Sequence, residues 1–341
     1  MTSQRSLLLI ASGILVAVFA GILFWYRVAP PQTPKRVYHI GILARGASSS
    51  YKASIESFLK KMNELGYREG ETAHFDVRFI EAREDLPKIV QEFLERGVDL
   101  IHTYSTPATQ EAYKATKDLS RPVSVVFGSM GDPIVAGVVK DINNPGTNVT
   151  GVASLSTELT AKRLELLKRI NPAIKRVAMP HSASELKDVA SEISVSIAKA
   201  TAKDLGMELV FYPVKSSAEN EVVAKRIIRK DVDGMIAAAD SLIFAGLSRY
   251  VAQSLKEKIP YAVFDISQVQ AGGLVGFGPD YIVSGEQSAV IVHQVLQGRD
   301  PAKIPVEVPR KLMLMINLKT AREIGIEVPQ DLLAEADLVI E

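Results

Sequence analysis

Apolar runs alternate with helical stripes along most of the chain. Residues 123–127 show no polar alternation, which is typical of a strand buried on both faces of a parallel sheet. Residues 52–65 instead space their apolar side chains, from Ile55 to Leu65, as a helix does, and Gly66 is suited to end that helix. The same reasoning predicts strands at 37–43, 75–80, 98–104, 148–152, 176–179, 208–212, 234–238, 261–264 and 273–277, and helices at 86–95, 158–170, 185–205, 218–229, 242–256 and 281–296.

The predicted strands and helices alternate, and the series restarts after Val152. Consecutive strand–helix–strand units favour right-handed crossovers and parallel sheets. Residues 37–341 are too many for one ordinary hydrophobic core and sufficient for two. We therefore predict an α/β fold with two doubly wound, parallel-sheet lobes that join near residues 150–156.

An apolar segment precedes the two lobes. Residues 6–26 are uncharged and lie between Arg5 and Arg27. At about 1.5 Å per residue, a helix of this length spans the roughly 30 Å hydrocarbon core of a membrane. The sequence thus predicts a transmembrane or signal-anchor helix at 6–26, with a cleaved signal peptide of unusual length as the alternative. The prolines within residues 27–36 predict an extended spacer.

The composition argues against several kinds of chemistry. The chain has no cysteine, which excludes an acylated-cysteine anchor, disulfides and a thiol nucleophile. Its 40 basic and 39 acidic residues are evenly mixed along the sequence, so the sequence shows no basic cluster of the kind that binds nucleic acid. The five histidines lack metal-ligand spacing, and the motifs G-x-S-x-G, GxGxxG and GxxxxGK[ST] are missing. We therefore expect no enzyme activity, cofactor, metal or nucleic-acid partner.

Residues 122–152 carry the most specific pattern. An apolar strand ends in a polar loop, and Asp132 and Pro133 then suit the N-cap and first position of a helix. A further strand at 148–152 follows the turn at 143–146. Open α/β sheets bind ligands where strands end and helices begin, so this block marks a candidate ligand-binding edge.

The same block closely resembles a segment of the ABC transporter substrate-binding protein family, whose members include tryptophan- and tyrosine-binding lipoproteins. Further similar segments are HIGIL at 39–43, VDLIHTYSTPATQEA at 98–112 and NLKTAREIGIEVPQDLLAEAD at 317–337. The resemblance covers nearly all of residues 37–341 and implies a type I periplasmic-binding-protein fold. The presumed ligand loops depart from the family pattern, for example at Gly131, where binders of aromatic amino acids usually have Ser or Thr.

The resemblance also implies how the chain divides between the lobes. Residues 37–152 and 276–303 are expected to form lobe 1, and residues 153–275 and 304–341 to form lobe 2 with the hinge and tail. A chain that crosses more than once makes a multi-strand hinge, which favours closure around a ligand.

In such a fold the ligand lies at the carboxyl ends of the strands of both lobes. Ser105 and Thr106 precede a proline-started helix and offer hydroxyls and N–H groups to a carboxylate, while a plain helix cap also explains Thr106. Ser129 lies on a glycine-flanked loop that a ligand can approach closely. Asp132 fits an N-cap better than a ligand contact.

The second lobe offers two carboxylates. Asp240 and Asp265 each follow a buried strand and are either partners for a ligand ammonium group or helix caps. Arg45, in the first lobe, either binds an anionic group or lies on the surface. The complete set of expected ligand-binding residues is Arg45, Ser105, Thr106, Ser129, Asp132, Ser156, His181, Asp240, Ser241 and Asp265.

These observations favour an extracytoplasmic solute-binding protein of an ABC-type uptake system. By resemblance, the ligand is an amino acid or a similar compact molecule and the partner an ABC permease. The protein is expected to be held at the membrane by its N-terminal helix, or secreted if that helix is cleaved. A ligand-sensing ectodomain of a membrane receptor or kinase is the alternative, and an α/β enzyme is the third possibility.

Overall fold

The structure is a computed structural model that describes residues 36–120, 122–183 and 189–341. The predicted apolar helix at 6–26 and nearly all of the predicted spacer at 27–36 lie outside these residues. Among the residues that are described, no helix is both long and apolar enough to cross a membrane.

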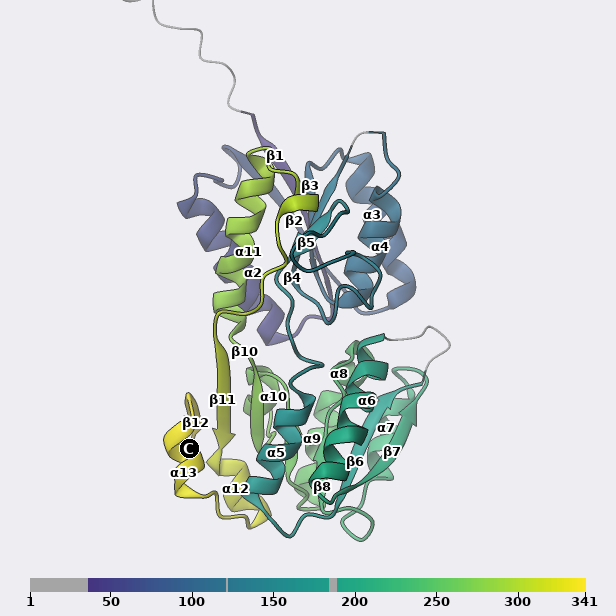
Figure 1. Ribbon diagram of the computed structural model, residues 1–341, viewed down its shortest axis with the longest axis vertical. Helices are drawn as coiled ribbons and strands as arrows, with labels where there is room; N and C mark the ends of the chain where they lie inside the picture. The colour runs from purple at the N-terminus through teal and green to yellow at the C-terminus, as the bar shows by residue number, and fades with distance from the viewer. Residues whose placement is uncertain (1–35, 121, 184–188) are drawn as a thin grey trace, which may run out of the picture. The chain divides into compact units, whose positions relative to one another are not determined.

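Residues Tyr38–Glu341 form one compact unit that contains two α/β lobes (Figure 1). The first lobe has a sheet in the order β2-β1-β3-β4-β5, with parallel pairing throughout. Helices α2 and α11 cover one face, and α3 and α4 cover the other. The bounds are β1 Tyr38–Arg45, α2 Ser49–Glu64, β2 Ala73–Ile80, η1 Arg83–Asp85, α3 Leu86–Glu95, β3 Leu100–Tyr104, α4 Thr106–Thr116, β4 Ser124–Ser129, β5 Val149–Gly151 and α11 Tyr281–Leu296.

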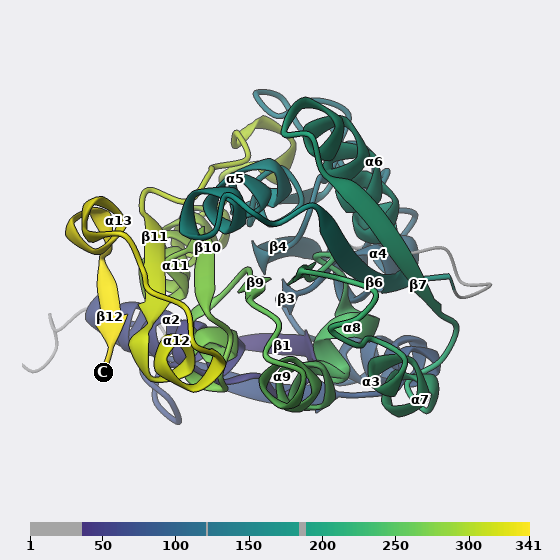
Figure 2. The same ribbon diagram turned by 90° about the horizontal axis from the view of Figure 1, so that it is seen from below.

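The second lobe has a sheet in the order β12-β11-β10-β9-β8-β6-β7 (Figure 2). Helices α5, α6, α12 and α13 pack on one face, and α7, α8, α9 and α10 on the other. The bounds are α5 Thr160–Ile170, β6 Arg176–Ser182, α6 Val189–Asp204, β7 Glu208–Val214, α7 Glu219–Lys225, β8 Gly234–Ile236, α8 Ser241–Ala245, α9 Leu247–Lys256, β9 Tyr261–Val263, α10 Ile266–Gln270, β10 Val275–Pro279, η2 Pro301–Lys303, β11 Leu312–Asn317, α12 Leu318–Ile324, α13 Gln330–Glu335 and β12 Leu338–Ile340.

Strand β1 illustrates why these runs form buried strands. Ile40, Ile42 and Ala44 pack into the core beneath α2 and α11, whereas Leu43 packs into the core beneath α3 and α4. Because successive side chains point to opposite faces, a strand with helices on both sides must be apolar at nearly every position. Polar groups are therefore displaced to the ends of the strands.

Three features of the fold differ from the sequence-based prediction. Asp132 and Pro133 begin a turn at 132–137 instead of a helix. The predicted helix at 242–256 is broken at Gly246 into α8 and α9. The second sheet is mixed, because β11 is antiparallel to β10.

Within the described residues, the chain passes between the lobes three times: between β5 and α5, between β10 and α11, and between η2 and β11. These three connecting segments also contact one another. Ala153 N donates to Glu307 O at 2.9 Å, and Asp280 N donates to Lys311 O at 3.0 Å. Strand β10 belongs to the second sheet, so the return to the first lobe begins at α11, slightly later than the expected residue 276.

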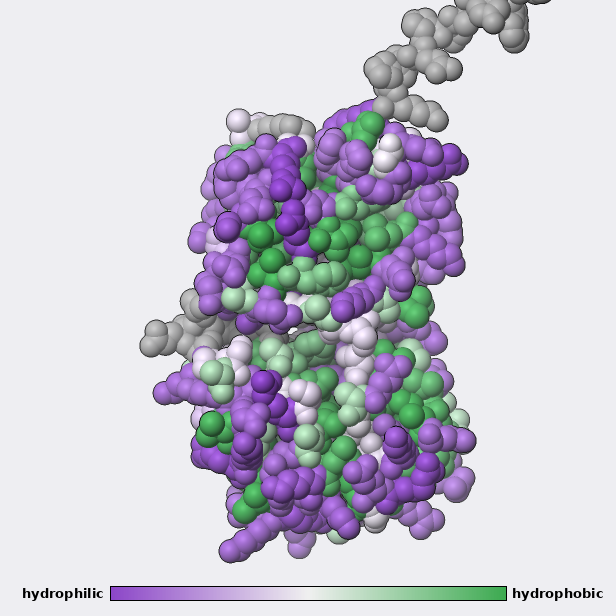
Figure 3. Space-filling view, turned by 180° about the vertical axis from the view of Figure 1, so that it is seen from behind, coloured by the Kyte–Doolittle hydropathy of each residue, from purple (hydrophilic) through white to green (hydrophobic). Residues whose placement is uncertain are grey.

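Helix α11 is inserted tightly into the first lobe. A Cβ at Gly285 would overlap the carbonyl oxygen of Ser54 and the hydroxyl of Ser57, so α2 and α11 can approach this closely only at a glycine. Seen from behind, polar residues dominate the surface of both lobes, and hydrophobic residues reach it in the middle of the first lobe and at several places on the second (Figure 3).

A buried histidine lies at the centre of the first lobe. His102 on β3 is fully buried and stacks on Phe58 with ring centroids 4.2 Å apart. Its Nδ1 lies 2.7 Å from Val126 O, which can only accept, so we assign the proton to Nδ1 and Nε2 accepts from the Tyr104 hydroxyl at 3.0 Å. Burial lowers the pKa of His102 to about 4, so the ring is neutral at physiological pH.

This histidine predicts a loss of stability in acid. Between pH 6.5 and 4 the unfolded chain binds a proton at residue 102 while the folded chain does not, so the free energy of unfolding falls as the pH is lowered. The fall should reach about 3 kcal/mol at pH 4. Urea unfolding of His102→Gln should show a flatter pH dependence over this range than the wild type. His74→Gln, at an exposed position, is the control, and equal slopes for all three proteins would refute the assignment.

Candidate functional site

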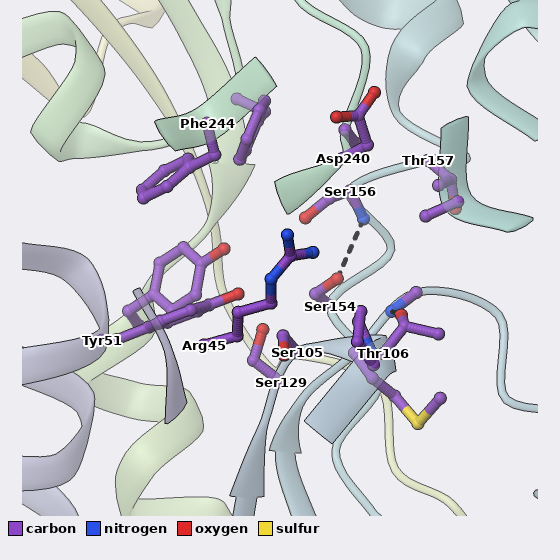
Figure 4. A pocket seen from close by; sticks show the side chains of 17 residues that line it. Arg45, Tyr51, Ser105, Thr106, Ser129, Ser154, Ser156, Thr157, Asp240 and Phe244 are labelled. Carbon is purple, nitrogen blue, oxygen red and sulfur yellow. Dashed lines mark hydrogen bonds between the residues drawn. The ribbon is translucent and has the colours of Figure 1, made fainter. Parts of the chain in front are cut away.

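A small cavity of about 50 Å³ lies where strand ends of both lobes meet (Figure 4). The first lobe contributes residues that follow β1, β3 and β4, and the second lobe contributes residues that follow β8 and β9. Residues 154, 156 and 157 of the first connection complete it. The lining residues are Arg45, Tyr51, Ser105, Thr106, Pro107, Ser129, Met130, Gly131, Ser154, Ser156, Thr157, Ala190, Ala239, Asp240, Phe244, Phe264 and Tyr281.

Six of the predicted ligand-binding residues line this cavity, namely Arg45, Ser105, Thr106, Ser129, Ser156 and Asp240. The guanidinium group of Arg45 extends into the space between the two lobes in Figure 4. Asp240 lies across the cavity from the first lobe and is buried. One basic and one acidic side chain therefore line the same cavity, amid a group of hydroxyls.

The helix cap suggested for Thr106 is provided by Ser105 instead. The cap of α4 is Ser105, whose hydroxyl accepts from Ala108 N at 3.4 Å. Thr106 Oγ1 accepts from Gly131 N at 3.1 Å and so joins the loops that follow β3 and β4. The explanation of Thr106 as a plain helix cap is thus wrong, because α4 begins one residue earlier than expected, at Thr106 itself.

The carboxylates among the expected ligand-binding residues accept hydrogen bonds from backbone N–H groups. Asp132 accepts from Ile134 N at 2.8 Å and Val135 N at 3.0 Å, and it is not among the lining residues. Its role as a cap is confirmed, although it caps a turn. Asp240 Oδ1 accepts from Ile243 N at 2.7 Å, and its Oδ2 accepts from Ser182 N at 3.1 Å.

Asp265 is also a cap and lies behind the cavity. Its Oδ1 accepts from Gln268 N at 3.0 Å and from the Ser267 hydroxyl at 2.6 Å. The side chain is fully buried, and burial raises the pKa of this carboxyl. Phe264, the residue before it, reaches the cavity instead.

His181 is not among the lining residues. The His181 ring packs edge-on against Phe211 with centroids 5.6 Å apart, and partial burial lowers the pKa of this histidine. Ser241 is the first residue of α8. Of the described side chains in the expected set, His181, Asp132 and Asp265 therefore lie apart from the six that line the cavity.

Four aromatic residues in the lining escaped the sequence analysis. Tyr51 from α2 stacks on Phe244 from α8, with centroids 6.2 Å apart and ring planes 22° apart. Phe264 follows β9 and Tyr281 begins α11. Phe264 directly precedes Asp265, so its position beside a predicted strand-end carboxylate was the available signal.

Tyr281, the first residue of α11, contributes a buried side chain to the lining. Burial, followed by the nearby Asp265 carboxylate, raises its pKa well above the usual value for tyrosine. The group therefore stays protonated and can donate a hydrogen bond at any physiological pH.

Arg163 supports the cavity from behind. Its guanidinium donates to Ser156 O at 2.5 Å, to Thr160 Oγ1 at 2.8 Å and to Phe277 O at 3.2 Å, and lies 5.8 Å from the centre of the Phe264 ring. Burial lowers its pKa to about 9. Sequence analysis missed it because Arg163 occupies a helix position at which a surface charge is usual.

The described residues contain no cluster of three or more His, Cys, Asp or Glu side chains that could hold a metal ion. The cavity offers instead aromatic faces, hydroxyls, one guanidinium and one carboxylate. Such a set can bind a small zwitterionic or polar molecule with an aromatic part through ring packing and hydrogen bonds.

Comparison with known proteins relates this geometry to a family. The family model for "ABC transporter substrate binding protein" matches residues 39–340. A tyrosine-binding protein of Clostridioides difficile (strain R20291) is 29% identical over 297 residues, which are 86% of this chain and 82% of the relative.

Solved structures agree with this result. A domain from Streptococcus pneumoniae in complex with L-Trp has a TM-score of 0.81 at 28% identity, and covers 89% of this chain and 99% of its own. A ligand-free, open structure of a substrate-binding protein with adhesive properties from Clostridium difficile has a TM-score of 0.65 at 25% identity, with the same coverage. The resemblance seen in the sequence is thus confirmed: the chain belongs to the ABC transporter substrate-binding protein family.

Proposed function

We propose that this protein captures an aromatic amino acid or a closely similar molecule outside the cytoplasm and delivers it to an ABC permease. The observation that carries the proposal is the cavity lining, which combines aromatic rings from both lobes with Arg45 and Asp240. An amino acid presents a side chain, a carboxylate and an ammonium group, and each of these has a partner of suitable chemistry in the lining.

The aromatic residues support recognition of a planar side chain. Tyr51 and Phe244 come from different lobes and lie nearly parallel, and Phe264 packs 5.7 Å from Phe244. Aromatic pairs in stacked or edge-on geometry contribute roughly 0.5–1.5 kcal/mol beyond the burial of their area. A ligand ring inserted beside Phe244 gains this interaction from both sides of the cleft.

The charged residues support recognition of a zwitterion. A guanidinium binds a carboxylate through two parallel hydrogen bonds, and Arg45 extends into the cavity where such a group can approach. Asp240 accepts from the backbone N–H groups of Ser182 and Ile243, and an ionised carboxylate is the kind of acceptor that pairs with an ammonium group.

The relatives favour the same ligand class. One relative is named a tyrosine-binding protein, and one structure contains L-Trp. Both of these molecules carry the three groups described above. A cavity of about 50 Å³ is too small for either, so we infer that the lobes separate to admit the ligand and close on it.

The direct test is a thermal-shift screen of the purified protein against L-Trp, L-Tyr, L-Phe, L-Leu and L-Lys, followed by calorimetry. A ligand at a hundred times its Kd should stabilise the folded state by about 2.7 kcal/mol. We expect shifts with the aromatic amino acids and none with L-Lys. A shift with L-Lys or L-Leu alone would contradict the proposed ligand class.

Phe244→Leu tests the aromatic wall. The substitution keeps an apolar side chain but removes the ring, so affinity for the aromatic ligand found in the screen should fall about three- to tenfold. Phe211→Leu is the matched control, because Phe211 belongs to the same lobe and packs on His181 outside the cavity. Equal affinities in the two variants would exclude Phe244 as a ligand contact.

Ser105 tests the polar wall because its backbone is strained. Its φ of 100° and ψ of 149° fall in a region that is almost reserved for glycine, at a cost of about 1–3 kcal/mol. Ser105→Gly should therefore raise the free energy of unfolding by about 1 kcal/mol or more, whereas Ser105→Ala keeps the strain, loses the cap and should lower it by about 1 kcal/mol.

Ligand affinity separates these two effects. Both variants lack the hydroxyl, so both should bind the ligand more weakly, by a similar factor, despite their opposite changes in stability. Wild-type affinity in both variants would mean that the Ser105 hydroxyl does not contact the ligand. Urea unfolding and calorimetry measure the two quantities independently.

A further inference from the structure

The first connection changes lobes at a single residue. Ser154 N donates to Met130 O at 2.7 Å, which ties Ser154 to the first lobe. Ser156 O accepts from Arg163 Nη2 at 2.5 Å, which ties Ser156 to α5 in the second lobe. Leu155 lies between these two attachments.

Leu155 is also conformationally strained. Its φ is 54°, in the left-handed region that non-glycine residues avoid. In the described part of the chain only Ser105 and Lys258 share a positive φ among non-glycine residues, and Lys258 is in an exposed turn. Strain of this kind persists only where surrounding contacts enforce it, and here those contacts come from different lobes.

Arg163 extends the same attachment to the second connection. While Nη2 holds Ser156, Nη1 donates to Phe277 O in β10, four residues before the start of α11. The side chain is fully buried, and its Nε has no acceptor among the described residues. One guanidinium thus fixes both connecting segments to the second lobe, so that neither can bend on that side of the attachment.

We propose that Leu155 is the bending point of the hinge and that Arg163 is the positioning residue that fixes the bend there. The arrangement seen here has a higher TM-score with the L-Trp complex, 0.81, than with the open structure, 0.65. In this arrangement Leu155 is held in its strained conformation. Separation of the lobes releases it to an ordinary negative φ. The strain therefore favours the open form, and ligand contacts must offset it during closure.

Distances between labels on the two lobes test this proposal without a ligand. The chain has no cysteine, and Glu84 and Ser216 are exposed residues of different lobes that line an outer cavity of about 620 Å³. Spin labels at Glu84→Cys and Ser216→Cys in the full chain then report the separation of the lobes by pulsed electron paramagnetic resonance.

Leu155→Gly and Leu155→Ala form the matched pair, because both remove the side chain but only glycine tolerates a positive φ. A left-handed conformation costs a non-glycine residue enough to change an equilibrium constant at least about fivefold. The ratio of short to long label distances should therefore be about fivefold higher in Leu155→Gly than in Leu155→Ala. It should be lower in Leu155→Val than in Leu155→Ala. Identical distributions in the three variants would overturn the proposal.

Arg163→Met tests the attachment. It keeps an apolar stem of similar length but removes the three hydrogen bonds, so the difference between Gly and Ala at position 155 should shrink below about twofold. If circular dichroism shows that this variant is unfolded, Arg163→Lys is judged by the same criterion. An undiminished difference would exclude Arg163 as the positioning residue. Although the biological use of the hinge rests on the proposed ligand capture, a failed ligand screen would leave these distances unaffected.

Discussion

The cavity follows from the burial of both faces of each sheet. Helices cover both faces of each sheet, so the side chains along the strands are buried in the hydrophobic cores. Parallel strands end at the same edge, and the chain can expose polar groups only there. The edge after β1, β3 and β4 meets residues that follow β8 and β9, and the resulting space is lined by both lobes.

This constraint made much of the fold predictable. Apolar runs located strands and helical stripes located helices, because a strand or helix that packs into a core must carry the corresponding pattern of apolar residues. The exceptions depend on contacts distant in sequence. The chain from Asp132 to Gly137 has good helix-start residues, but Gly137 adopts a left-handed conformation with a φ of 74°, so only a turn forms. Strand β11 follows the third connection, by which the chain leaves the first lobe. Its antiparallel pairing with β10 depends on contacts between residues that are distant in sequence.

The site was predictable by location but less so by residue type. Loops at strand ends were expected to surround the site, and Ser105, Thr106, Ser129 and Ser156 from these loops line the cavity. Of the three expected aspartates, Asp132 and Asp265 do not line it; both accept from N–H groups at the start of a turn or helix, which compete with any ligand for a carboxylate. The aromatic residues escaped notice because a Tyr or Phe in an apolar context is normally a core residue. Tyr51 meets that description on α2, yet its ring reaches Phe244 in the other lobe.

Segments that connect the lobes leave both sheets, and their backbone groups lose the ladder partners that strands provide. Buried carbonyls without partners would destabilise the fold by roughly 1–3 kcal/mol each. Arg163 supplies donors for Ser156 O and Phe277 O, which no apolar side chain of equal size could do. Gln287 does the same for the third connection, donating to Val308 O and accepting from Arg310 N. The buried charge is thus explained by geometry: a long, multiply donating side chain reaches Ser156 O and Phe277 O together, whereas an amide is sufficient for Val308 O and Arg310 N.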